Sequence, residues 1–122
     1  MCGFFGLISK KKKLNKKSFL EIIDQISHRG PDDQGFFENN EIQLGFRRLS
    51  IIDIKKGSQP MISNNNRFIM VFNGEIYNYK NIQNDLFNKG IKLKTNSDTE
   101  ALLEAFSEFG LEYIKNINGM FA

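Results

Sequence analysis

The sequence is poor in the residues that build disulfides and metal sites, and this shortage excludes two classes of protein. Its 122 residues include one Cys, one His and no Trp. A single cysteine cannot form an internal disulfide, which excludes a disulfide-stapled secreted scaffold and favours a cytoplasmic location. One histidine without a Cys-x-x-Cys pair leaves no zinc-ligand spacing. We therefore expect no metal site in this chain.

Long apolar runs and a secretory signal are also missing. No apolar stretch approaches the ~18 residues that span a bilayer. The short apolar start is followed by four lysines at positions 10–13, which reverses the charged-then-apolar order of a signal peptide. We expect no membrane partner.

The charge is modestly basic, with a formal net charge of +3 and a pI of about 9.0. Much of the excess lies in KKKKLNKK at positions 10–17. Such a block can mark a nucleic-acid surface. No aromatic residue is interleaved with these lysines and no nucleic-acid motif follows, so we interpret the block as a solvated connection and expect no nucleic-acid partner.

Apolar periodicity predicts interleaved strands and helices in a chain of one domain's length. Capping boxes at Ser18 and Ser97 predict two helix starts, and a third helix is expected over 80–89, before Gly90. The Asn39-Asn40 pair predicts a hairpin turn with positive φ. The expected strands are 3–8, 35–38, 41–48, 67–72 and 91–94.

The expected strands and helices together predict an α+β fold with largely antiparallel sheets. The last residues, 118–122, are typical of a turn that enters an apolar strand. We expect the chain to be cut within that strand.

Cys2 is the first candidate for chemistry, because it follows the initial methionine and precedes a glycine. A thiolate is a strong nucleophile. If Met1 is removed, the thiol and an α-amine that can act as its general base belong to one residue. By position alone, a small buried hydrophobic role is the alternative.

Asn73-Gly74 is the second candidate. An Asn-Gly pair commonly forms a tight hairpin turn. The same pair can instead supply a side-chain amide and a backbone N–H to an oxyanion hole. The residues alone leave both interpretations open.

Charged residues and the one histidine complete the candidates. Arg47 and Arg48 with Asp98 are either ordinary surface charges or a clamp for an amino-acid zwitterion, arginine on the carboxylate and aspartate on the ammonium. His28 lies in a Gly-Pro loop, where we expect it to fix the loop through hydrogen bonds.

Seven motifs occur in an order that resembles one family, the N-terminal glutaminase domain of glutamine-hydrolysing asparagine synthetases, a class II glutamine amidotransferase. The motifs lie at 1–6, 28–32, 48–53, 59–60, 73–78, 97–100 and 118–122. The resemblance implies an N-terminal nucleophile hydrolase, that is, a four-layer αββα sandwich of two mainly antiparallel sheets. Residues 1–122 would then be one glutaminase domain, partial at its C-terminal end.

The resemblance also implies roles for individual residues. Cys2 would be the nucleophile after loss of Met1, and Asn73 with the Gly74 N–H would hold the oxyanion. The residues implied to bind glutamine are Arg48, Leu49, Ser50, Ile51, Ile52, Asn73, Gly74, Glu75 and Asp98. No cofactor is implied for this domain.

The implied partners are L-glutamine and a C-terminal synthetase domain of the same chain, which would use ATP and Mg²⁺ to make asparagine from aspartate. The resemblance leaves a homodimer open. The alternatives are the same glutaminase domain serving another carboxylate acceptor, such as a sugar uronate or a β-lactam precursor, a non-catalytic fragment, or another class II amidotransferase. Enzymes of that last group typically carry a different arginine motif at 47–51.

Overall fold

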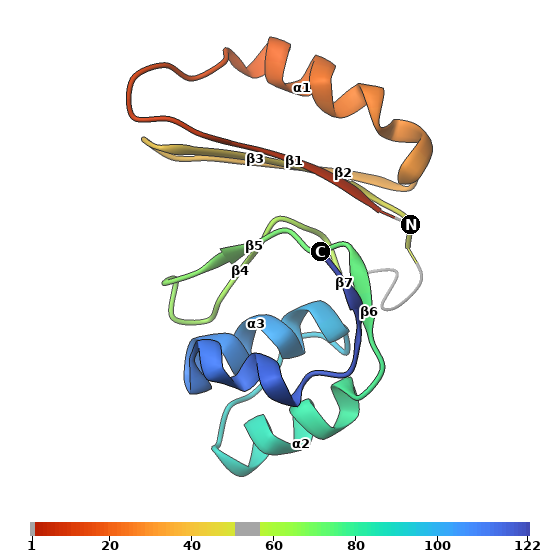
Figure 1. The fold of residues 1–122 in the computed structure, drawn as a ribbon, viewed down its shortest axis with the longest axis vertical. Coiled ribbons are helices and arrows are strands. Elements are labelled where there is room, and N and C mark those ends of the chain that lie inside the picture. The colour runs from red at the N-terminus through yellow and green to blue at the C-terminus, as the bar shows by residue number, and fades with distance from the viewer. Residues whose placement is uncertain (1, 51–56) are drawn as a thin grey trace.

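A three-stranded antiparallel sheet forms the first half of the chain in this computed structural model, which describes residues 2–50 and 57–122. Its order is β1-β3-β2, with β1 at Gly3–Ile8, β2 at Asp33–Glu38 and β3 at Ile42–Arg48. Helix α1 (Lys16–Gln25) lies along one face of the sheet (Figure 1). A short 3₁₀ turn, η1 (Ser27–Arg29), leads from α1 to β2.

The contact between α1 and the sheet centres on a glycine. Gly45 of β3 is paired with Phe5 of β1 and Phe36 of β2. The ring of Phe19 from α1 contacts both phenylalanines, at centroid distances of 5.3 and 5.2 Å. Phe19 and Ile23 are fully buried. The missing side chain at Gly45 therefore provides the space that these two residues fill.

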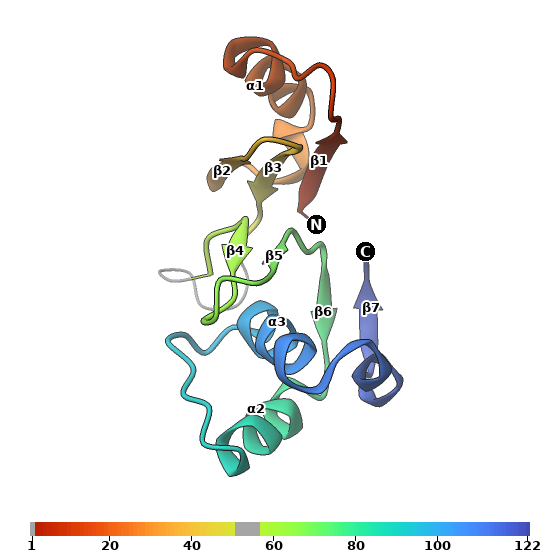
Figure 2. The same cartoon turned by 90° about the vertical axis from the view of Figure 1, so that its left-hand side faces the viewer.

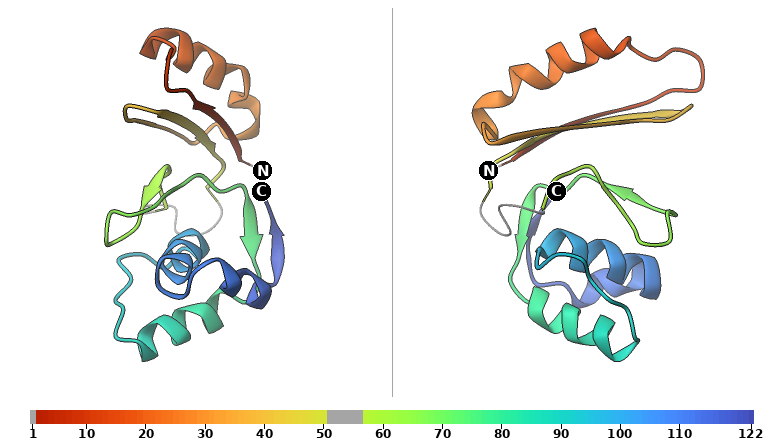
Figure 3. Two further views of the ribbon diagram at one scale, coloured as in Figure 1. Left: turned by 60° about the vertical axis from the view of Figure 1, so that its left-hand side comes forward. Right: turned by 180° about the vertical axis from the view of Figure 1, so that it is seen from behind.

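The second half contains two short antiparallel strand pairs and two helices. Strand β4 (Met61–Ile62) pairs with β5 (Ile69–Met70), and β6 (Gly74–Ile76) pairs with β7 (Gly119–Phe121), both antiparallel. Helices α2 (Tyr79–Asn88) and α3 (Asp98–Phe109) pack together on the side of these strands away from the first sheet (Figure 2). The 3₁₀ segment η2 (Leu111–Asn116) returns the chain to β7 beside β6 (Figure 3).

A second apolar core holds this half together. Its buried members come from β6 and the stretch before it and from α2 and α3: Phe72, Ile76, Ile82, Leu86, Ala101, Leu102 and Ala105. The contact of α1 with the first sheet and this second core lie in different halves of the chain. The segments that connect the halves therefore determine how the halves are placed relative to each other.

The structure confirms the expected α+β class with antiparallel sheets. Strand 3–8, the hairpin, the three helices and a strand within 118–122 are present. Gly90 and Gly110 both have φ of 79° at helix ends, a conformation that favours glycine. The strands β4 and β6 were not predicted, because each is only two or three residues long.

Two turn and cap predictions are wrong in detail. Helix α1 is capped by Asn15, whose Oδ1 accepts the N–H of Ser18 at 2.9 Å, so Ser18 lies inside the helix. Asn66 is the only non-glycine with positive φ among the described residues. The Asn39 side chain instead closes the hairpin by accepting the N–H groups of Glu41 and Ile42 at 2.9 and 2.8 Å.

The expected strand at 91–94 is absent and that at 67–72 is shorter than predicted. Near residue 94, backbone donors bind a side chain instead of a strand: the N–H groups of Lys94 and Thr95 donate to the Glu100 carboxylate. Glu100 therefore does not complete a capping box with Ser97, although Ser97 does cap α3 by accepting the Glu100 N–H at 3.1 Å.

No helix within residues 2–50 or 57–122 combines the length and apolarity needed to cross a bilayer.

The packing at Gly45 predicts a large stability loss on adding a methyl group. A Cβ there would lie 2.4 Å from Ile23 Cδ1 and 2.8 Å from Phe19 Cε1. We expect Gly45→Ala to lower the free energy of unfolding by about 1–3 kcal/mol, as overpacking of a core does. Gly6→Ala is the control, since its Cβ would lie 3.2 Å from Leu44 Cδ2 alone. Denaturant unfolding measures both variants, and equal losses would contradict the packing argument.

A buried carboxyl predicts a pH-dependent stability difference. Burial raises the pKa of Glu104, although the Asn64 N–H donates to it at 2.7 Å. A raised pKa in the folded state means that this group's contribution to stability is full at low pH and is lost as pH rises through that pKa. Glu104→Gln keeps an acceptor and cannot ionise. We therefore expect the variant to gain stability relative to the wild type as pH rises above the ordinary Glu pKa of about 4.3. A difference in unfolding free energy that is constant with pH would refute this.

Candidate functional site

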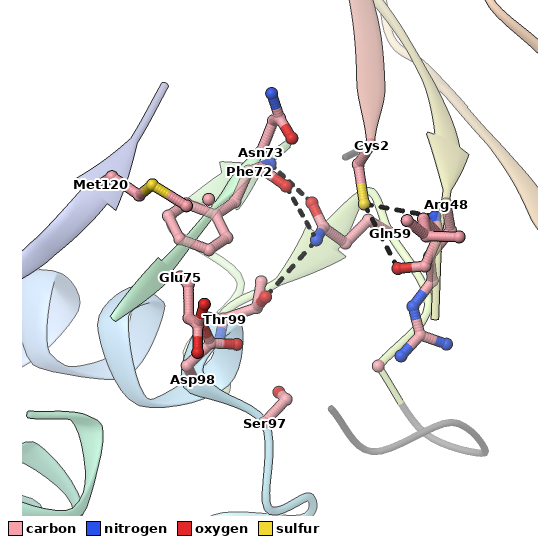
Figure 4. Close-up of a pocket in the computed structure, with 13 residues that line it drawn as sticks. Cys2, Arg48, Gln59, Phe72, Asn73, Glu75, Ser97, Asp98, Thr99 and Met120 are labelled. Carbon is pink, nitrogen blue, oxygen red and sulfur yellow. Dashed lines mark hydrogen bonds between the residues drawn. The ribbon is translucent and has the colours of Figure 1, made fainter. Parts of the chain in front are cut away.

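A pocket collects residues from both halves of the chain (Figure 4). One wall comes from the starts and ends of strands in the first sheet, and the other comes from β6 and the start of α3. The lining residues are Cys2, Arg48, Leu49, Gly57, Gln59, Phe72, Asn73, Gly74, Glu75, Ser97, Asp98, Thr99 and Met120.

Cys2 lies directly before β1 and is held by the backbone after β3. The Leu49 N–H donates to Cys2 Sγ at 3.3 Å, and the thiol donates to the Leu49 carbonyl at 3.6 Å. Arg29 Nε donates to the Cys2 carbonyl at 3.1 Å. The thiol is half-buried and lines the pocket. It is therefore not the enclosed core cysteine of the alternative interpretation.

Asn73-Gly74 does not form a hairpin turn. Asn73 and Ala122 exchange two backbone hydrogen bonds of 2.9 Å each, and Gly74 begins β6 opposite Phe121. A Cβ at Gly74 would lie 2.3 Å from the Met120 carbonyl oxygen, so the close pairing of these strands requires glycine. In residues 2–50 and 57–122, no protein group binds the Asn73 side-chain amide, which leaves it available to a ligand.

Opposite charges lie on different sides of the pocket. Arg48, at the end of β3, lies beside Cys2, whereas Glu75 and Asp98 lie together near Thr99 (Figure 4). Arg48 and Asp98 are each 6% exposed, so neither is an ordinary surface charge. Asp98 accepts the Ile76 N–H at 3.1 Å and the Thr99 N–H at 2.9 Å, and it is also the first residue of α3.

One residue predicted to bind substrate, Ser50, does not line the described pocket. Ser50 lies in a neighbouring depression, and its N–H donates to Asp32 Oδ2 at 2.7 Å. Ile51 and Ile52 lie outside the described residues. The expectation that His28 fixes its loop is wrong, since its ring makes no hydrogen bond to the described part of the chain. The side chains of Arg29 and Asp32 bind the backbone of Cys2 and Ser50 from this loop instead.

Six lining residues are not among the site residues predicted from the sequence: Gly57, Gln59, Phe72, Ser97, Thr99 and Met120. For Gln59 a signal existed, because the pair at 59–60 is one of the seven motifs. No group of three or more His, Cys, Asp or Glu side chains in the described ranges is arranged to hold a metal ion.

The arrangement defines a chemical class. A thiol can attack a carbonyl carbon. A side-chain amide and a backbone N–H can bind the oxyanion that forms. Charges of both signs suit the carboxylate and ammonium of a small zwitterion. These groups have the chemistry that thiol-dependent acyl transfer on a small zwitterion requires.

Comparison with known proteins identifies the family. A family model described as a glutamine amidotransferase domain matches residues 1–122. The chain belongs to this glutamine amidotransferase domain family.

Curated relatives agree with the family assignment. Over its full length the chain is 40% identical to a protein of Bacillus subtilis named asparagine synthetase [glutamine-hydrolyzing] 1. It is 34% identical to asparagine synthetase B [glutamine-hydrolyzing] of Escherichia coli and 31% identical to an Arabidopsis thaliana protein named asparagine synthetase [glutamine-hydrolyzing] 1. The chain covers 20%, 22% and 21% of these three proteins, respectively, so it spans about a fifth of their length.

Proposed function

We propose that this chain is the glutaminase domain of a glutamine-hydrolysing asparagine synthetase. The observation that carries the proposal is that Cys2, Arg48, Asn73, Gly74 and Asp98 line a single pocket in a chain of the glutamine amidotransferase domain family. The reaction is hydrolysis of the glutamine side-chain amide to glutamate and ammonia.

In the proposed reaction, the Cys2 sulfur attacks the side-chain amide carbon of glutamine and forms a C–S bond. The carbonyl π electrons move to oxygen, where the Asn73 amide and the Gly74 N–H donate to the oxyanion. Collapse of this intermediate breaks the C–N bond and releases ammonia, which takes the proton lost by the thiol. Water then cleaves the glutamyl thioester to glutamate and restores the thiol.

The proton is relayed by the α-amine of Cys2 after removal of Met1. The Leu49 N–H, 3.3 Å from Sγ, remains a donor to sulfur when the thiol proton leaves. These two groups would keep the sulfur oriented through both halves of the reaction.

Substrate recognition follows from the charges of the pocket. Arg48 binds the α-carboxylate of glutamine, and Glu75 with Asp98 binds its α-ammonium. The backbone of Leu49 lines the pocket beside these charges, and contacts of glutamine with Ser50, Ile51 and Ile52 stay a prediction of the family resemblance. Binding both charged groups at the α-carbon directs the side-chain amide of the substrate towards Cys2.

The ammonia is used by a synthetase region outside this chain, where ATP and Mg²⁺ activate aspartate for conversion to asparagine. This part of the proposal is supported by the names of the relatives and by their length, since the chain spans only 20% and 22% of them. We assign the fold to the four-layer N-terminal nucleophile hydrolases, supported by helices on the outer sides of two sets of antiparallel strands. The proposed location is the cytoplasm, and a homodimer stays a prediction.

The proposed nucleophile predicts the behaviour of a Cys2→Ala protein. In the full-length enzyme, glutaminase activity and glutamine-dependent asparagine synthesis should fall to background, because no thioester can form. Synthesis from added ammonia should be retained, since Cys2 acts only in ammonia release. Equal loss of both activities would show that Cys2 is structural. Intact-mass measurement of the wild type checks the α-amine relay, which full activity in a species that retains Met1 would refute.

Substitutions of Asn73 and Asp98 should change different kinetic parameters. Asn73 is proposed to bind a charge that exists only after attack, so Asn73→Ala should lower kcat by about 10²–10³ with little change in KM. Asp98 is proposed to bind an ammonium that is present throughout, so Asp98→Ala should mainly raise KM. Steady-state kinetics with glutamine and with an analogue lacking the α-amine measure both effects.

The alternative for Asp98 is a purely structural role at the start of α3. In that case Asp98→Ala would leave KM unchanged and would lower only the melting temperature, with a loss of about 0.3–1 kcal/mol through the helix dipole and more if the Ile76 N–H lost its partner. A melting curve beside the kinetics distinguishes the two roles.

A further inference from the structure

Gln59 lies in the pocket wall, and hydrogen bonds hold both ends of its side-chain amide (Figure 4). Its side chain is 6% exposed. Its Oε1 accepts the Phe72 N–H at 2.6 Å, and its Nε2 donates to the Phe72 carbonyl at 3.2 Å. The same Nε2 donates to Thr99 Oγ1 at 3.4 Å. The amide thus pairs with one backbone residue as a neighbouring strand would.

This pairing fixes the peptide group that leads into Asn73. The carbonyl of the Phe72–Asn73 peptide accepts from Gln59, and its N–H donates to the Ala122 carbonyl at 2.9 Å. A peptide group is planar, so holding its two polar ends determines the direction in which the chain enters Asn73. The placement of the Asn73 side chain and the Gly74 N–H follows from that direction.

Gln59 and its neighbour also connect this segment to α3 and to β2. Thr99 directly follows Asp98, so the Nε2 contact reaches the start of α3. On the other side, the Gln59 backbone lies against β2, where a Cβ at Gly35 would be 1.6 Å from the Gln59 carbonyl oxygen. Ser58 Oγ donates to Asp33 Oδ2 at 2.9 Å and anchors the same stretch.

We propose that Gln59 is a positioning residue of the glutaminase reaction, which holds the Asn73 amide and the Gly74 N–H at the place where the oxyanion forms. This inference rests on the proposed function. Oxyanion donors act only if they are held close to the productive geometry, so loosening their support lowers turnover more than substrate binding. Gln59 itself acts through the backbone of Phe72.

The chain contains a matched control in Gln43. This side chain is fully buried, and its amide also pairs with one backbone residue: Oε1 accepts the Leu14 N–H at 3.1 Å and Nε2 donates to the Leu14 carbonyl at 2.8 Å. Its Nε2 also donates to Glu38 Oε2 at 3.0 Å. Gln43 does not line the pocket. Replacing Gln43 removes a similar set of hydrogen bonds without touching the segment before Asn73.

The experiment compares Gln59→Leu with Gln43→Leu in the full-length protein. We expect Gln59→Leu to lower the glutaminase kcat by about 10- to 100-fold, somewhat less than removal of an oxyanion donor, and to change KM by less than about threefold. Gln43→Leu should keep kcat within about twofold, even where its melting temperature falls as far or further. Gln59→Glu keeps the size and the acceptor but loses both donors, so it should also lower kcat.

Each other outcome overturns the inference. Unchanged kcat in Gln59→Leu, or equal kcat losses in the two leucine variants, would show that Gln59 only stabilises the fold. If Gln59→Leu does not fold, the glutaminase kcat of Gln59→Glu tests the inference. An unchanged kcat in that variant would refute the positioning role of Gln59. A wild type without glutaminase activity would overturn the proposed function, and this inference with it.

Discussion

The antiparallel register of β1 on β3 is the constraint on which the site depends. Successive side chains of a strand point to opposite faces, so a slip of one residue would move every side chain to the wrong face. Phe5 contacts Phe19 of α1, and Arg47 pairs with Asp24 of the same helix, so these two side chains lie on the helix-covered face. Cys2, directly before β1, and Arg48, at the end of β3, lie an odd number of residues from Phe5 and Arg47, and both line the pocket. The packing of α1 over Gly45 thus determines where the thiol and the guanidinium lie.

Buried carboxylates on α3 organise the irregular segments of the other half. Asp98 accepts the Ile76 N–H, Glu100 accepts the N–H groups of Lys94 and Thr95, and Glu104 accepts the Asn64 N–H. Hydrogen bonds to ionised acceptors offset part of the cost of burying charge. A carboxylate has about four acceptor sites. Asp98 uses two of them on backbone donors, which leaves capacity for a substrate ammonium. A structural and a binding role at Asp98 are therefore compatible.

The sequence predicted those parts of the fold whose signals are local. The strand 3–8 is a short apolar run, the hairpin follows from its turn residues, and α3 follows from its cap and apolar face. The segment 91–94 alternates like a strand, but its backbone donors bind Glu100, a contact that no local pattern reveals. The pairing of β6 with β7 joins segments far apart in sequence. For the site, the motifs predicted Cys2, Arg48, Asn73 and Asp98, all of which line the pocket. The hydrogen bonds of Gln59 could be seen only in the structure, since a lone glutamine has no periodic pattern in the sequence.

The two walls of the pocket belong to different packing units, so the distance between thiol and oxyanion donors is not set by either core alone. Cys2 and Arg48 are placed by the sheet that α1 covers, and Asn73, Gly74 and Asp98 are placed by the core of α2 and α3. The stretch at 57–59 touches both units: its backbone lies against Gly35 of β2, and the Gln59 side chain binds Phe72. A reaction that needs a nucleophile and two donors to converge on one carbonyl group requires such a connection. In the described chain, the buried amide of Gln59 provides it at the residue next to Asn73.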